Sequence, residues 1–147
     1  MGATRVIGES GILAEVDATG ALLTTPRQNR DITVLPLAAR TATVSSPDIT
    51  NHSGRSVIVY IRVTATAGAP SVIFTIEGRD AVSGDYYPIL AALAMTATGT
   101  RTLRVGPGLT AAANLTVNDL LPRTWRVTAT HANADSFTAS VGASVVS

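Results

Sequence analysis

The sequence predicts an all-β protein: an antiparallel β-sandwich of about seven strands, jelly-roll or Ig-like, with an N-terminal β-hairpin arm. Three observations carry this prediction. Short runs rich in Val, Ile and Thr alternate between apolar and polar positions with a period of two, as half-buried strands do. Turn residues separate these runs at intervals of roughly eight to twelve residues. Helix-period segments do not alternate with the strands, which argues against a parallel α/β sheet.

Residues 38–147 are predicted to form the sandwich body. Its candidate strands are residues 40–45, 57–63, 72–78, 86–93, 100–105, 125–129 and 137–141. The period of two assigns one set of side chains to the core. These are Val57, Val59, Ile61, Val63, Val72, Phe74, Ile76, Leu103, Val105, Trp125, Val127, Ala129, Phe137, Ala139 and Val141. Trp125 is expected to anchor the core between two sheets, whereas Tyr60 and Arg62 fall on the opposite face of their strand.

Residues 1–37 are predicted to form the arm. Two strand-like runs, residues 12–16 and 21–24, flank the turn-forming segment Asp17–Gly20, which is a hairpin signal. A third run, residues 32–35, is ended by Pro36. Because an isolated two-stranded hairpin is marginally stable in water, we expect the arm to dock on the body or on a neighbouring subunit.

The composition excludes several classes of function. The chain has no cysteine, so neither a disulfide framework nor a thiolate metal site is expected. The formal net charge is +1 and the charges are scattered, with no basic run of the kind that marks nucleic-acid binding. The apolar runs are too short to span a membrane, and the start of the chain does not resemble a signal peptide. Apolar residues make up 46% of the chain and charged residues 14%, which favours surface buried against partner chains.

All basic residues are arginine and none is lysine. Two interpretations stay open. One is a GC-rich coding sequence. The other is that arginine serves planar, bidentate contacts at protein interfaces.

No residue pattern predicts catalysis, a cofactor or a metal. His52 and His131 are far apart in the sequence, are expected to be exposed turn residues, and do not supply the ligands of a zinc site. Ser83 lies in a Val-Ser-Gly turn rather than in a nucleophile elbow. Asp80 and Asp85 bracket the same loop, but the fuller calcium-binding pattern is absent, so we expect a solvated turn.

Tyr86 and Tyr87 are adjacent and must point to opposite faces of their strand. We expect one of them in the core and the other on the surface, where it is a candidate for contact with a partner.

Residues 51 to about 146 resemble a family of small proteins encoded among the structural genes of tailed phages. The segments that carry this resemblance are Ser53–Arg55, Gly68–Ser71, Ile76–Asp80, Ser83–Tyr87, Thr96–Thr100, Pro107–Thr110, Leu121–Val127 and Ser140–Ser144. The arm segments Ala14–Asp17 and Gly20–Leu22 are similar to the leading segments of phage virion proteins. The resemblance implies a virion component with a β-sandwich fold, often a capsid decoration or cement protein, and no catalytic residues.

The expected function is therefore that of a decoration protein, made in the cytoplasm of a bacterial host. It would bind the major capsid protein on the capsid surface as a homo-oligomer or as lattice-bound copies. The candidate contact residues are Ile12, Leu13, Leu22, Leu23, Val34 and Tyr86. The alternatives are a tail, neck or baseplate protein of the same kind of particle and a carbohydrate-binding surface module, which the aromatic content of 4% disfavours. An enzyme is not expected.

Overall fold

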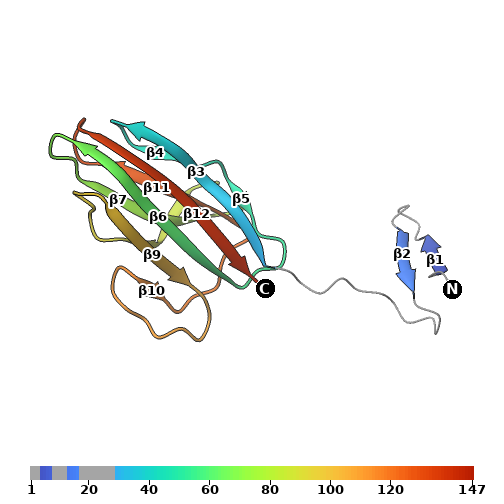
Figure 1. The fold of residues 1–147 in the computed structure, drawn as a ribbon. Coiled ribbons are helices and arrows are strands. Elements are labelled where there is room, and N and C mark those ends of the chain that lie inside the picture. Colours follow the sequence, from blue (N-terminus) through green and yellow to red (C-terminus); the bar gives the residue numbers. More distant parts are fainter. Residues whose placement is uncertain (1–3, 8–12, 17–28) are drawn as a thin grey trace.

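Two β-sheets packed face to face make up the body of the protein (Figure 1). The computed structural model describes residues 4–7, 13–16 and 29–147, and these contain no helix, so none that could cross a membrane. Its strands are β1 (Thr4–Ile7), β2 (Leu13–Val16), β3 (Arg30–Arg40), β4 (Val44–Ser45), β5 (Ile49–Thr50), β6 (Ser56–Ala67), β7 (Val72–Arg79), β8 (Tyr86–Ala91), β9 (Gly99–Val105), β10 (Thr116–Val117), β11 (Thr124–His131) and β12 (Ser136–Val146). The predicted all-β sandwich is confirmed.

One sheet, named here the front sheet, faces the viewer in Figure 1 and has the strand order β10-β9-β6-β12-β3. Its neighbours are antiparallel except for the short β10, which runs parallel to β9. The other, named the back sheet, has the order β4-β11-β7-β8, and β5 pairs with β11 beyond the end of β4. Strands distant in the sequence are thus neighbours in both sheets.

The core lies between the two sheets and follows from the alternating pattern. Every side chain that the period of two assigned to the core is at most 3% exposed. Trp125 is fully buried, as predicted, and Phe74 contacts Phe137 across the core with a ring centroid distance of 6.1 Å. Burial of this apolar surface is the main favourable contribution to folding.

Strand β3 crosses the boundary that the sequence suggested at residue 37. It pairs with β12 from Arg30, opposite Val145, to Arg40, opposite Phe137. Pro36 did not end the strand because β3 is an edge strand, where a missing N–H leaves no partner unpaired. The ladder with β12 shifts its register around Pro36. The body therefore begins at about residue 30.

The N-terminal hairpin also differs from the prediction. Strand β2 pairs antiparallel with the preceding strand β1, with Thr4 opposite Val16 and Ile7 opposite Leu13. The partner expected for this segment, residues 21–24, lies outside the described residues.

Candidate interaction surfaces

The predicted contact residues lie in different parts of the chain and differ in burial. Ile12, Leu22 and Leu23 lie outside the described residues, and Leu13 lies on β2. Val34 is 3% exposed and belongs to the core, so its proposed contact role is corrected. Sequence reasoning had placed it in an arm, whereas its strand is part of the front sheet.

Tyr86 is half-buried and its polar and aromatic groups are both engaged within the chain. Its hydroxyl donates a hydrogen bond to Asp48 Oδ1 at 2.7 Å, which raises the pKa of the phenol. The guanidinium carbon of Arg126 lies 3.3 Å from the centroid of its ring. A partner would have to displace these contacts, so Tyr86 is a poorer contact candidate than its sequence position suggested.

Tyr87 points to the opposite face, as expected, but neither tyrosine is fully buried. Its ring covers Gly78, its neighbour on β7: a Cβ added to Gly78 would lie 2.5 Å from the phenol oxygen. Tyr87 is still 46% exposed. The expectation of one core tyrosine is therefore wrong: Tyr87 lies opposite Gly78, but β8 is an edge strand and the ring stays partly open to solvent.

A chain of polar contacts covers the outer face of the back sheet. We name it the back-sheet network. Its members are Ser45, Asp48, Glu77, Arg79, Tyr86, Arg126 and Thr128. At its centre Glu77 Oε2 accepts hydrogen bonds from Arg126 Nε and Thr128 Oγ1, each at 2.7 Å.

The network extends from this centre in both directions. Thr128 Oγ1 accepts a bond from Ser45 Oγ at 2.8 Å. At the other end, beyond the Tyr86 ring, Asp48 pairs with Arg79 at 2.9 Å. The charges on this face are therefore matched within the chain. Sequence reasoning missed the network because it joins residues from β4 to β11, and only the strand register brings them together.

The loop between β7 and β8 forms several hydrogen bonds within itself. Asp80 Oδ1 accepts the N–H groups of Val82, at 2.7 Å, and Ser83, at 3.4 Å, and these bonds lower the pKa of the carboxyl. Asp80 is thus a turn residue, as predicted. Gly84 has a φ of 79°, a left-handed conformation that favours glycine. The loop presents Val82, which is 96% exposed, beside a cleft of about 640 Å³.

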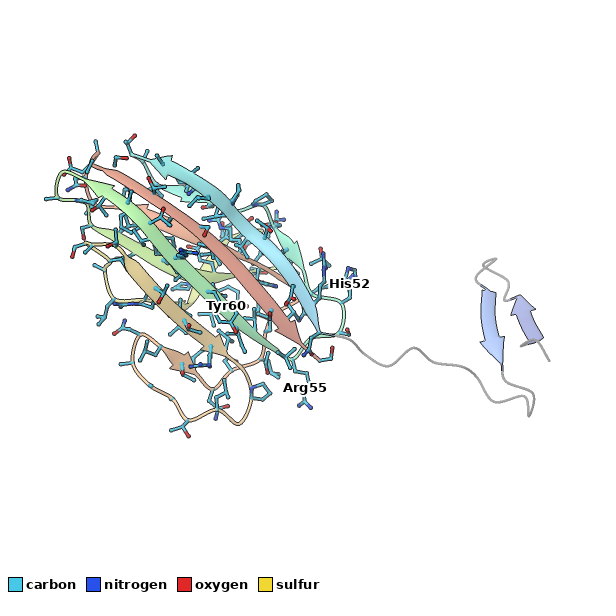
Figure 2. All side chains as sticks on the ribbon, in the orientation of Figure 1. His52, Arg55 and Tyr60 are labelled. Atoms are coloured by element: carbon cyan, nitrogen blue, oxygen red, sulfur yellow. The ribbon has the colours of Figure 1, made fainter. Side chains whose placement is uncertain are left out.

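The outer face of the front sheet is different in character. Tyr60, on β6, is half-exposed and stands beside Gly142 of β12 and Thr102 of β9. Figure 2 shows Tyr60 within this sheet, with Arg55 and His52 at the end where the C-terminus lies. A shallow hollow of about 330 Å³ opens over Gly142, between Tyr60 and Thr33. The absence of a side chain at Gly142 contributes to this hollow.

The two histidines have different environments. His52 is exposed, as predicted. His131 is not an exposed turn residue: it ends β11, and both of its ring nitrogens are buried without a hydrogen-bond partner. Its ring lies edge-on to Phe137, with the centroids 6.2 Å apart. Burial, and secondly the charge of Arg40, lower the pKa of the imidazole. The alternation of β11 continues to this residue and was the available signal for its burial.

Within residues 4–7, 13–16 and 29–147, no group of three or more His, Cys, Asp or Glu side chains is placed to hold a metal ion.

Comparison with known proteins adds little to this description. Neither the protein-family models nor the curated proteins include a match to the chain. Among solved structures, a chain from the structure of the infectious bursal disease virus Gx strain aligns with 97% of this chain, at 13% sequence identity and a TM-score of 0.49. The aligned region is 37% of that chain. At this TM-score the likeness carries no argument, so the fold rests on the sheets and core described above.

Proposed function

We propose that the chain is a structural protein of a virus particle and, more closely, a decoration or cement protein on the outside of a tailed-phage capsid. The observation that carries the proposal is a complete core combined with large apolar side chains left on the surface. Besides Val82 at the tip of the β7–β8 loop, those exposed in the described part of the chain are Leu37, Tyr60, Ile73 and Tyr87 on strands and Leu93, Leu115 and Leu120 between strands. The buried cores of interfaces are enriched in aromatic residues and depleted in charged ones.

The resemblance to phage structural proteins supports the same proposal. Two of its motifs contain glycines at turns of the fold: Gly68, between β6 and β7, and Gly84, between β7 and β8, each have a φ of 79°. Such a conformation strongly favours glycine. These two motifs therefore fit turns of the sandwich.

Two of the sandwich edges, β3 and β8, favour binding through faces and loops rather than by addition of a strand. On the β3 edge, Pro36 has no N–H to donate, and the Arg40 guanidinium donates to the carbonyl oxygens of Pro36, at 2.7 Å, and Ala38, at 3.1 Å. On the β8 edge, Pro88 lacks an N–H, and Asn114 Nδ2 donates to the carbonyl oxygen of Ala91 at 3.0 Å. Devices of this kind prevent uncontrolled edge-to-edge pairing.

A decoration protein acts by burying area on neighbouring capsid subunits. Each Å² of apolar surface removed from water contributes about 25 cal/mol, and the loss of freedom on binding offsets much of the total. Repetition of the contact over the shell holds the capsid proteins together.

Binding to capsids tests the proposal. Heads lacking decoration protein, purified from the phage that encodes the chain, would be mixed with the full chain and sedimented. We expect the chain to co-sediment in a fixed ratio to the major capsid protein and to raise the temperature at which the heads rupture. A variant lacking residues 1–28 tests the N-terminal region without removing β3. Rings formed by the free chain, or co-purification with tails and not heads, would instead assign it to the tail, neck or baseplate.

A further inference from the structure

The arginines on the outer faces of the two sheets differ in whether they form ion pairs. On the back sheet, Arg126 and Arg79 are ion-paired with Glu77 and Asp48. On the front sheet, Arg62 of β6 and Arg104 of β9 are exposed, and no ion pair or side-chain hydrogen bond involves either within the described part of the chain. The two arginines on the outer face of the back sheet are thus ion-paired, whereas Arg62 and Arg104 on the front sheet have no ion-pair partner within the described residues.

The register places these arginines around Tyr60. Tyr60 lies opposite Thr102, with the Arg62–Thr100 pair on one side and the Ile58–Arg104 pair on the other. The two arginines are therefore about 13 Å apart along the strands. Strands β6, β9 and β12 contain no Asp or Glu at all. The face is cationic at its two corners and aromatic at its centre.

The hollow beside Tyr60 completes this arrangement. It is lined by small or short side chains around Gly142, with Thr33 and Asp31 of β3 on the far side. The Asp31 carboxylate accepts a hydrogen bond from the Ser144 hydroxyl, which does not pair its charge, so the hollow itself suits an uncharged side chain of a partner. Tyrosine and arginine are the residue types that most often dominate binding energy at interfaces, and a tyrosine next to a hollow is a typical anchor.

We infer that the Tyr60 face, defined by Tyr60, Arg62, Thr102, Arg104 and Gly142, docks a carboxylate-bearing protrusion of a partner protein. In this arrangement a small side chain of the partner enters the hollow against the Tyr60 ring, and carboxylates on either side pair with Arg62 and Arg104. The inference rests on the proposed function, in which the partner is the capsid lattice. Charge complementarity selects carboxylates opposite Arg62 and Arg104, which form no ion pair within the described chain, and an uncharged side chain at the hollow, which Asp31 borders.

Charge reversal and truncation on this face test the inference. The variants are Tyr60→Ala and the double variant Arg62→Glu with Arg104→Glu, and the control is Arg123→Glu, which reverses an exposed arginine outside the face. Thermal unfolding of each variant checks its fold. We expect head binding to weaken by about tenfold or more in both face variants and to be retained in the control. Binding of the full chain should also weaken with added salt, and this dependence should shrink in the double variant.

The outcomes separate the inference from the proposed function. If the unmodified chain does not bind heads, the proposed function fails and the inference fails with it. If the unmodified chain binds and the face variants bind equally well, only the inference is overturned. An equal loss in the Arg123→Glu control would indicate a general charge effect and would also overturn it. Sedimentation velocity of the free chain tests whether a second copy of the chain occupies this face instead. If the free chain forms an oligomer that Tyr60→Ala dissociates, and head binding is unchanged, the face is assigned to a second copy.

Discussion

His131 shows how a single side chain couples the core to pH. Its imidazole nitrogens are buried without partners, next to Phe137 and under the influence of the Arg40 charge. These conditions disfavour the protonated ring, so the pKa is below its ordinary value of 6.5 in the folded state. In the unfolded chain the imidazole regains that ordinary value.

The lowered pKa of His131 makes the free energy of unfolding depend on pH. Between the two pKa values the unfolded state binds more protons, so the free energy of unfolding rises with pH in that range. The full stability is present above about pH 6.5 and decreases as the pH falls towards the folded-state pKa. We expect urea unfolding to show this loss between about pH 7.5 and about pH 5.5, and a His131→Leu variant to lose less over the same interval. Equal losses in the two proteins would show that His131 protonates freely in the folded state.

Individual residues were predictable where one strand decides their position. Trp125 and Phe137 were assigned to the core from the period of two and are fully or almost fully buried. Val34 was misjudged because β12 makes β3 part of the front sheet. The environment of Tyr86 also depends on another strand, since Arg126 covers its ring. The alternation within one strand shows on which face a residue lies. It does not show which other strands cover that residue.

At the scale of paired strands, the back-sheet network predicts unequal ion pairs. Glu77 and Arg126 have side-chain exposures of 19% and 23%, whereas Asp48 and Arg79 are 31% and 44% exposed. Exposed pairs are weakened by solvent and by the entropy of fixing long side chains. The partly buried Glu77 also accepts the Thr128 hydroxyl.

Double-mutant cycles measure this difference. With Glu77→Gln and Arg126→Gln, we expect a coupling energy of about 1–2 kcal/mol, because hydrogen bonds to charged groups are stronger than neutral ones. The matched cycle, Asp48→Asn and Arg79→Gln, should give roughly 0.2–1 kcal/mol. Coupling in the second cycle as large as in the first would mean that exposure does not control the strength of these pairs.

We predict that the body needs strand β3 to fold cooperatively. A variant that starts at residue 29 keeps the whole strand, whereas one that starts at residue 38 loses Val34 and Leu35 and uncovers the edge of β12. Removal of even one large buried side chain costs about 2–5 kcal/mol, a large fraction of the stability of a typical domain. We therefore expect the shorter deletion to unfold cooperatively and the longer one to lose its cooperative transition. A sharp transition in the chain starting at residue 38 would return β3 to the arm.

For the whole molecule, the sheet class was predictable and its connectivity was not. Periodicity and turn spacing predicted strands, a two-layer arrangement and an inward face. The pairing of β12 with both β6 and β3, and of β11 with β7, depends on contacts between segments far apart in the chain. The Tyr60 face depends on the same pairings, since Gly142 and Thr102 meet Tyr60 only through the register of three strands.

The two ends of the body lie together, which leads to a prediction for the complete fold. The Ser147 N–H donates to Asn29 Oδ1 at 3.4 Å, and β3 leaves this point beside the last residues of β12. A short glycine-rich linker can therefore join residue 147 to residue 29 without strain. New ends between Thr110 and Ala111 fall in an exposed stretch before β10 and interrupt no strand.

We expect this permuted body, residues 111–147 followed by the linker and residues 29–110, to fold with a circular dichroism spectrum like that of the unpermuted 29–147 body. Its stability should lie within about 2 kcal/mol of that body, because every strand pairing is kept and the loop cost grows slowly with length. The Tyr60 face would also be intact, so head binding should survive the permutation if that face carries it. A control permutant with new ends between Ile61 and Arg62 cuts β6 at the centre of the front sheet and should not fold. Failure of the first permutant with a folded control would show that the order of the strands along the chain, and not their pairing, determines this sandwich.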